Sequence, residues 1–278
     1  MFIFRWVLSL SLLLCALKLS YAEAPLPVVI WHGMGDTCCN NETMGRVVRL
    51  VQEEIPGVFV HSVKLGGTES ADRNAGFFGN LNSQIDSVCT ELASINELKH
   101  GVNLMGFSQG GLFLRALVQR CPQLGPHALV SFGSPHSGVA RIPECPRDDV
   151  LCNWMRKLAS RGVYSWYIRD HVVQAQYFKD PERLDDYLQH NIFLPDVNNE
   201  LLPRKPEYRE RLLQLKKMVL VRFANDDMIY PEFSSWFGFL DSQGNSVPVE
   251  NTTMFKEDWL GLRELDESGR LDISAFCI

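Results

Sequence analysis

A serine flanked by glycines is the first residue whose type and setting suggest chemistry. The stretch Gly106-Phe107-Ser108-Gln109-Gly110 fits the pattern G-x-S-x-G. It follows a short apolar run and opens an amphipathic segment, which is the strand-to-helix setting of a nucleophile elbow. Such a turn presents the hydroxyl at a helix N-terminus, where partial positive charge favours a developing anion. The pattern predicts Ser108 as an acyl-transfer nucleophile, and the alternative is a glycine-rich turn without chemistry.

Acyl transfer by a serine also needs hydrogen-bond donors for the oxyanion of the tetrahedral intermediate. One donor is the backbone N–H that follows the nucleophile, here Gln109. The other comes from an early strand-to-helix loop, and the glycine-rich stretch His32-Gly33-Met34-Gly35-Asp36 is placed for it. We interpret His32 as a packed or hydrogen-bonded structural histidine rather than a catalytic group.

The carboxylate of a serine-based triad is expected after a later strand, downstream of the nucleophile. Asp226 and Asp227 directly follow the apolar run Val219–Phe223. Their position alone does not separate them, so both are candidates, and a turn-capping carboxylate is the alternative for either.

The histidine that should complete the order Ser, Asp, His does not follow in this sequence. All seven histidines precede the two aspartates: His32, His61, His100, His127, His136, His171 and His190. Because a serine hydroxyl is a poor nucleophile without a base, we expect weak turnover. Only His136 or His190 is considered as a substitute, and either would have to reach Ser108.

The apolar runs that carry these residues predict an α/β fold. Strands are expected at 26–31, 58–65, 102–105, 128–132 and 219–223, and helices at 44–55, 85–98, 110–120 and 209–218. This alternation predicts a mainly parallel sheet with helices on both faces. The pattern breaks at about 139–217, which we interpret as a lid-like helical insertion within one domain spanning 23–278.

The first 22 residues have the features of a signal peptide. Arg5 precedes an apolar run at 7–17, and small residues allow cleavage after Ala22. The alternative is an uncleaved membrane anchor, but the run is short for a span and Lys18 interrupts it. No other segment is long and apolar enough to span a bilayer. The formal charge of −6 argues against nucleic acid as a partner.

Cysteine content supports a secreted chain. Seven cysteines lie beyond the predicted signal peptide, and their spacing is not that of a zinc site. In an oxidising compartment, three disulfides and one leftover thiol are expected. The sequons at Asn41 and Asn251 predict glycosylation sites if they are exposed.

Several longer stretches together closely resemble one family. These are Val29–Asp36, Cys38-Cys39, Met105–Gly111, Gln119–Pro122, Val173–Tyr177, Asn191–Leu194 and Ser235–Phe239. Over about residues 25–273, the chain resembles the lysosomal palmitoyl-protein thioesterases.

The resemblance implies an α/β-hydrolase fold and a role for particular residues. Ser108 matches the family's nucleophile and Asp226 its triad acid, while Met34 and Gln109 match its oxyanion donors. It also implies three disulfides, Cys38–Cys39, Cys89–Cys121 and Cys145–Cys152. The family's last strand would begin near Gly269–Leu271, so the last strand and the closing helix are expected to be truncated. Cys277 lies in the unmatched tail.

The resemblance further implies the reaction and the compartment. The expected substrates are S-acylated proteins or peptides and other long-chain fatty acyl thioesters, hydrolysed in the lysosome without a metal or cofactor. Two alternatives stay open: a secreted carboxylester lipase, and an inactive form that binds acyl groups or is degraded. The sequence predicts no oligomeric state.

Overall fold

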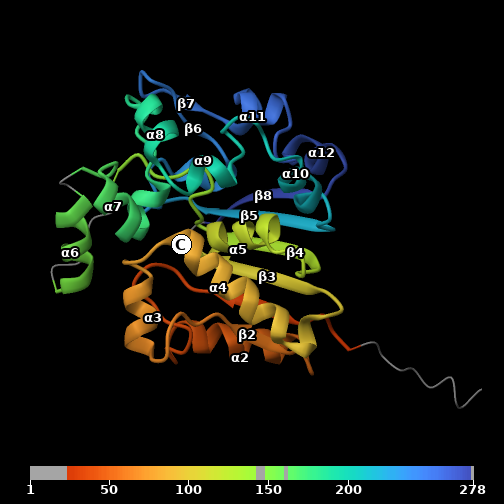
Figure 1. Ribbon diagram of the computed structural model, residues 1–278. Helices are drawn as coiled ribbons and strands as arrows, with labels where there is room; N and C mark the ends of the chain where they lie inside the picture. The colour runs from red at the N-terminus through yellow and green to blue at the C-terminus, as the bar shows by residue number, and fades with distance from the viewer. Residues whose placement is uncertain (1–23, 142–147, 160–161, 277–278) are drawn as a thin grey trace, which may run out of the picture.

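A six-stranded sheet forms the centre of the computed structural model, which describes residues 24–141, 148–159 and 162–276 (Figure 1). The predicted signal peptide, 1–22, lies outside the described residues. The strand order is β2-β1-β3-β4-β5-β8, and every pair of neighbours is parallel. The strands are β1 (Val28–Trp31), β2 (Val60–Ser62), β3 (Val102–Phe107), β4 (Pro126–Phe132), β5 (Lys217–Phe223) and β8 (Leu271–Phe276). The predicted parallel α/β fold is confirmed.

Helices cover both faces of this sheet, as side-chain alternation along β1 shows. Val29 and Trp31 belong to the large core beneath α4 (Leu81–Ser94) and α5 (Gln109–Arg120). Val28 and Ile30 instead join a smaller cluster beneath α2 (Met44–Glu54). All four side chains are buried, which explains why β1 is continuously apolar in sequence.

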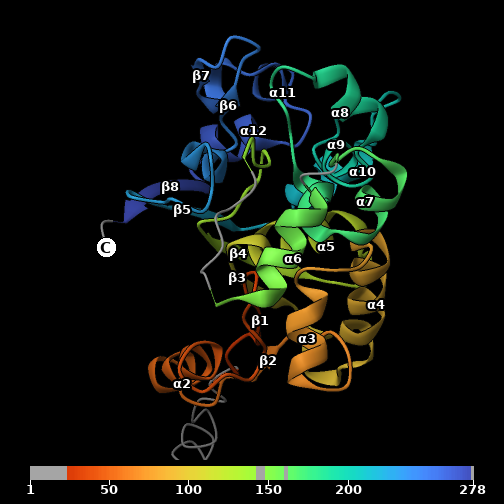
Figure 2. The same ribbon diagram turned by 90° about the vertical axis from the view of Figure 1, so that its left-hand side faces the viewer.

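The predicted insertion lies between β4 and β5 and consists of short helices. These are α6 (Val150–Ala159), α7 (Trp166–His171), η2 (Val173–Tyr177), α8 (Leu184–His190), α9 (Leu194–Val197) and α10 (Pro206–Leu212). Helices α6 and α7 stand beyond the carboxyl ends of the central strands, as the two views of Figures 1 and 2 agree. The assignment of this stretch to one domain with the sheet stays a prediction.

A buried arginine joins the insertion to the core. Arg115 of α5 is fully buried and donates to the Val197 carbonyl at 2.9 Å, to the His136 carbonyl at 3.1 Å and to Asn198 Oδ1 at 2.7 Å. Burial lowers the pKa of Arg115 to about 9. One cation thus satisfies acceptors from α9 and from the loop after β4, so both segments are positioned by α5.

Two further elements differ from the sequence-based expectations. The helix predicted at 209–218 begins earlier, with Pro206 in its first turn, and ends at Leu212, because Met218 and Leu220 are buried in strand β5. Helix α3 (Glu69–Ala75) was not predicted, because its polar sequence has no apolar stripe.

The last strand is longer than the expected truncation. Strand β8 pairs with β5 from Leu271 through Phe276, six residues in register. The structure describes nothing beyond residue 276, so the predicted loss of a closing helix stays a prediction.

Smaller elements complete the region between β5 and β8. They are η3 (Glu232–Trp236), β6 (Phe239–Leu240), β7 (Ser246–Val247), η4 (Val249–Asn251), α11 (Thr253–Lys256) and α12 (Leu262–Glu267), with η1 (Asn96–Leu98) earlier in the chain. In the described part of the chain, no helix is long and apolar enough to cross a membrane.

Candidate active site

Ser108 lies in a strained turn between β3 and α5. Its backbone has φ 51° and ψ −128°, a conformation that non-glycine residues rarely adopt. Its N–H donates to the Phe132 carbonyl at 2.7 Å, which fixes the turn against β4. A Cβ at Gly106 would lie 2.3 Å from Gly111 Cα, and one at Gly110 would lie 2.3 Å from the Trp31 carbonyl oxygen. The glycines of the motif are therefore required by close backbone contacts.

The glycine-rich loop after β1 contacts this serine. A Cβ built on Gly33 would lie 3.1 Å from Ser108 Cβ and 3.8 Å from its hydroxyl oxygen. Gly35 has φ +81°, which suits a glycine turn. Met34, between them, is half-buried against the small apolar cluster that includes Phe77. The backbone of this loop therefore lies directly beside the Ser108 side chain.

Gln109, which begins α5, is held by three side-chain hydrogen bonds. Its Nε2 donates to the Gly76 carbonyl at 3.1 Å. Its Oε1 accepts from Gln174 Nε2 at 3.2 Å and from Tyr177 Oη at 3.1 Å. All the polar side chains in this network are buried, so the first turn of α5 and its free N–H groups are held in place.

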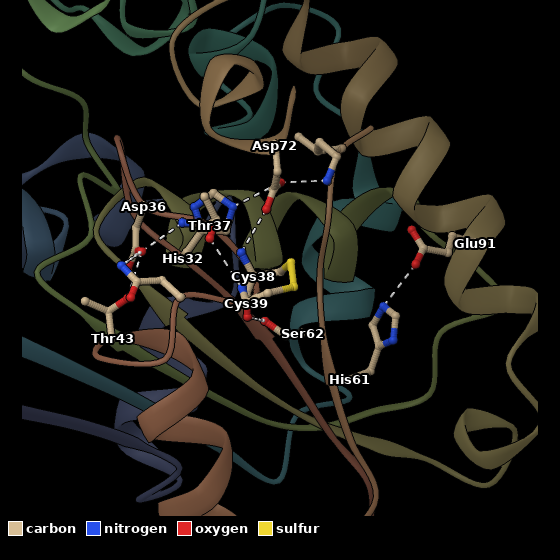
Figure 3. Close-up of a disulfide and its surroundings, with 12 residues drawn as sticks. His32, Asp36, Thr37, Cys38, Cys39, Thr43, His61, Ser62, Asp72 and Glu91 are labelled. Carbon is tan, nitrogen blue, oxygen red and sulfur yellow. Dashed lines mark hydrogen bonds and ion pairs between the residues drawn. A yellow bond between two sulfur atoms is a disulfide. The ribbon is translucent and has the colours of Figure 1, made fainter. Parts of the chain in front are cut away.

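A buried ion pair anchors the loop from the other side, as Figure 3 shows. His32 Nε2 lies 3.2 Å from Asp72 Oδ1, and the two side chains are 1% and 0% exposed. Asp72 also accepts from the Leu65 N–H at 2.7 Å and from the Cys38 N–H at 2.8 Å. The second nitrogen of His32 contacts the Gly33 carbonyl at 2.8 Å. This confirms that His32 is a hydrogen-bonded structural histidine.

The pairing shifts the pKa of each member in the direction that favours its charged form. Burial lowers the pKa of His32, but the hydrogen bond to Asp72, the Gly33 carbonyl and nearby carboxylates outweigh it, so the pKa is raised above 6.5. Burial raises the pKa of Asp72, but the hydrogen bonds from His32 and Cys38 and the histidine charge outweigh it, so the pKa is lowered.

Asp226 and Asp227 have different surroundings. Asp226 Oδ1 accepts from the N–H groups of Met228 and Ile229, both at 2.9 Å. Its Oδ2 lies 3.4 Å from an ideal Cβ on Gly133, the residue that follows β4. Asp227 is exposed. Burial raises the pKa of the Asp226 carboxyl, partly offset by its two backbone donors. A cavity of about 240 Å³ adjoins both aspartates.

Among the described residues, no histidine forms a hydrogen bond with the Ser108 hydroxyl. His136 is fully buried, with Nε2 2.9 Å from Ser131 Oγ and its ring stacked on Phe237. Burial and the charge of Arg115 lower the pKa of His136 well below 6.5. The ring of His190 contacts Arg169 at 3.4 Å. In this structure both substitute bases considered from the sequence are engaged elsewhere.

The predicted disulfide cysteines and glycosylation asparagines concern the processing of the chain rather than its chemistry. The structure contains the Cys38–Cys39 and Cys89–Cys121 disulfides. Cys152 is disulfide-bonded, but its expected partner Cys145 lies outside the described residues. Asn41 and Asn251 are exposed, and their glycosylation stays a prediction. Within the described ranges, no group of three or more His, Cys, Asp or Glu could hold a metal ion.

Asp72 and Tyr177 support the site but were not singled out from the sequence. Asp72 lies in a polar segment whose pattern gives no sign that its carboxylate is buried. Tyr177 lies in one of the stretches that carry the family resemblance, and that was its only signal.

The strained turn at Ser108 between a parallel strand and a helix is typical of enzymes of the α/β-hydrolase fold. The family model described as palmitoyl protein thioesterase matches residues 27–277. Palmitoyl-protein thioesterase 1 of Caenorhabditis elegans is 45% identical over 94% of this chain and 89% of its own length. Palmitoyl-protein thioesterase 3 of Dictyostelium discoideum is 37% identical, over 95% and 88% of the two chains. The lysosomal thioesterase PPT2 homolog of Drosophila melanogaster is 31% identical, over 97% and 90%.

The chain belongs to the palmitoyl protein thioesterase family and is a thioester hydrolase. The resemblance described from the sequence is confirmed, and the matched region extends to residue 277.

Proposed function

We propose that this chain hydrolyses long-chain fatty acyl thioesters on protein or peptide cysteines through an acyl-enzyme at Ser108. The observation that carries this proposal is the strained, positive-φ backbone of Ser108, which lies against the Gly33 loop in a chain of this family. The serine oxygen would attack the thioester carbonyl, the C–S bond would break, and the cysteine thiol would leave with a proton. Water would then hydrolyse the serine ester and release the fatty acid.

The proposed roles of the surrounding residues follow from their positions. The N–H groups of Gln109 and Met34 would stabilise the oxyanion, because α5 begins at Gln109 and the Met34 loop lies against the serine. Asp226 is favoured over Asp227 as the triad carboxylate, because it is half-buried and two backbone donors hold it. Its Oδ2 would orient an imidazole base.

Among the described residues, none of the seven histidines of this sequence forms a hydrogen bond with the Ser108 hydroxyl, so no histidine is assigned as the base. The cavity beside Asp226 measures about 240 Å³ and is lined by Phe223, Asn225 and Met228 as well as the aspartates. Asp226 Oδ2 lies beside Gly133, and the carbonyl of the preceding Phe132 accepts from the Ser108 N–H, so we propose that an imidazole held by Asp226 can accept the Ser108 proton. Imidazole supplied in solution is therefore expected to rescue turnover.

The experiment is hydrolysis of a palmitoyl thioester by the purified chain at mildly acidic pH, with and without added imidazole. Slow turnover that requires Ser108 and rises with imidazole concentration is expected. Ser108→Ala should abolish it, and Asp226→Ala should remove the imidazole response. A chain as inert as its Ser108→Ala variant under all conditions would overturn the proposal. His136→Ala and His190→Ala test the two substitute bases, and neither is expected to change the rate.

We further propose that the chain acts in the lysosome, reached through the secretory pathway. Three features support this: the predicted signal peptide, the Cys89–Cys121 disulfide and relatives named lysosomal thioesterases. The test is immunofluorescence of the expressed chain beside a lysosomal marker, together with glycosidase treatment. A cytosolic distribution without glycan would contradict the proposal.

A further inference from the structure

The neighbouring residues Cys38 and Cys39 form a disulfide in the loop that follows β1 (Figure 3). Cys39 is exposed, whereas Cys38 is only 2% exposed. A dissolved thiolate can therefore approach the sulfur of Cys39, and the sulfur that it displaces is the buried one of Cys38. Thiol–disulfide exchange requires such access to one sulfur of the bond.

The Cys89–Cys121 disulfide differs in access and in the length of chain that it closes. Cys121 is 2% exposed and Cys89 is half-buried. Its cysteines are 32 positions apart, whereas Cys38 and Cys39 are adjacent. Because the entropy of loop closure grows with loop length, the bond between adjacent cysteines restrains the unfolded chain far less. Opening it should leave the overall fold intact, so its effect is local.

The backbone of Cys38 is held at both its N–H and its carbonyl. The N–H donates to Asp72 Oδ2 at 2.8 Å, and the carbonyl accepts from Ser62 Oγ at 2.9 Å. The disulfide closes the peptide unit between the two cysteines into a small ring, which limits rotation about the soft backbone bonds on either side of that unit. The disulfide therefore helps to fix the orientation in which Cys38 donates to Asp72.

Asp72 connects this ring to the loop beside Ser108. Its Oδ1 lies 3.2 Å from His32 Nε2, and both side chains are buried. His32 directly precedes Gly33, whose ideal Cβ would lie 3.1 Å from Ser108 Cβ. Losing the hydrogen bond from Cys38 would leave a buried carboxylate oxygen unsatisfied, which is costly. A change in the ring is thus transmitted through Asp72 to the loop that carries Gly33.

We propose that the Cys38–Cys39 bond is a thiol-exchange site, and that opening it loosens the loop beside Ser108. A thiolate attacks Cys39 Sγ, the bond between the two cysteines breaks, and Cys38 leaves as a thiolate that takes a proton from water. A second thiolate attacks the external sulfur of the mixed disulfide, and Cys39 leaves in the same way. Two electrons thereby pass from two external thiols, which become a disulfide.

The reductant is a small thiol such as cysteine, the same chemical class as the thiol that thioester hydrolysis releases. The exchange does not involve the Ser108 hydroxyl. It is therefore measured without any turnover, and its failure is distinguishable from failure of the proposed enzymatic activity.

The first experiment reduces the folded wild-type chain in graded cysteine–cystine buffers at about pH 8, near the ordinary thiol pKa of about 8.5. After acid quenching, alkylation and proteolysis, mass spectrometry counts the reduced cysteines in each peptide. The peptide with Cys38 and Cys39 should be half reduced at a cysteine concentration at least about tenfold below that needed for Cys89 and Cys121. Simultaneous reduction of both pairs, or reduction only in urea, would overturn the proposal.

Two single substitutions test which sulfur is attacked. Cys38→Ser leaves the exposed thiol, and Cys39→Ser leaves the buried one. Cystine should form a mixed disulfide at the remaining thiol of Cys38→Ser at least about tenfold faster than at that of Cys39→Ser, because access controls thiol reactivity. Peptide mapping locates the product, and thermal denaturation checks that both variants are folded. Equal rates, or faster reaction of Cys39→Ser, would contradict attack at Cys39.

Hydrogen exchange measures the consequence for the loop. Selective reduction should raise amide exchange about tenfold in peptides covering 32–39, where hydrogen bonds to Asp72 are weakened, and leave peptides from α2 unchanged. The double variant Cys89→Ser and Cys121→Ser is the control, and it should respond to reduction in the same way. Unchanged exchange at 32–39 after complete reduction of Cys38 and Cys39 would show that the bond does not restrain the loop and would overturn the proposal.

Discussion

At the scale of single residues, Asp72 is the buried charge on which the loop beside Ser108 depends. Its two oxygens accept from His32 and from the N–H groups of Leu65 and Cys38, which come from separate segments. The stability that this pair contributes depends on pH. The raised pKa of His32 gives a contribution that is complete below pH 6.5 and lost as pH rises through the raised value. The lowered pKa of Asp72 gives a second contribution to stability, which is present above pH 3.8 and is lost as pH falls through the lowered value.

Asp72→Asn is therefore expected to lower the free energy of unfolding by about 3–5 kcal/mol near pH 5, because it leaves a buried imidazolium without its partner. The loss should be smaller at a higher pH, above the raised pKa of His32, because the imidazole is then neutral in the folded and unfolded states. Urea denaturation at the two pH values measures it.

The control is Glu91→Gln, which removes the partner of His61, a pair whose side chains are 20% and 41% exposed (Figure 3). This change should cost less than about 1 kcal/mol. Equal effects of the two substitutions, or a loss at Asp72 that does not vary with pH, would contradict the role given to the buried pair.

Gly110 offers a second test at this scale. A methyl group there would collide with the carbonyl oxygens of Trp31 and His32 at 2.3 and 2.5 Å. Gly110→Ala should thus destabilise the fold by about 1–3 kcal/mol or more and displace the loop after β1. Gly67→Ala, where nothing lies within 4 Å, should leave stability within about 0.5 kcal/mol of the original. Thermal denaturation distinguishes the two, and similar melting temperatures would refute the close approach.

At the scale of elements, the Cys89–Cys121 disulfide connects α4 to the residue that ends α5. The two cysteines are 32 positions apart, so the bond removes loop-closure entropy from the unfolded chain. Helix α5, which begins directly after Ser108, is thereby tied to its neighbour.

Replacing both cysteines by serine should lower the free energy of unfolding by about 3–4 kcal/mol. The midpoint of guanidinium denaturation reports it. An unchanged midpoint would show that helix packing alone holds the pair. Activity per folded molecule should not change, because neither cysteine takes part in the hydrogen-bond network around Ser108.

At the scale of the whole molecule, β8 is an edge strand with exposed apolar residues. Five of its six residues are exposed, among them Ile273 at 39% and Phe276 at 58%. In the described part of the chain, β8 pairs only with β5. An exposed apolar edge favours pairing with another copy of the chain.

The double substitution Ile273→Thr and Phe276→Thr is expected to reduce concentration-dependent self-association, measured by sedimentation velocity. Leu50→Gln, which removes a 54% exposed leucine from a helix with satisfied backbone groups, should have little effect. If the helix substitution works as well as the strand substitutions, surface hydrophobicity rather than the strand edge drives association.

The sequence by itself determined the parallel α/β fold, the serine elbow and the family. These depend on local patterns: buried strands are continuous apolar runs, and the elbow needs glycines at fixed spacing because backbone atoms touch there. Tertiary structure decided what no local pattern encodes. A carboxylate in polar helix α3 became the buried partner of His32, forty residues away, because the loop after β1 and the segment after β2 both bring donors to it. It also separated Asp226 from the exposed Asp227 and placed His136 against Ser131, since burial and hydrogen bonding depend on which segments meet in space.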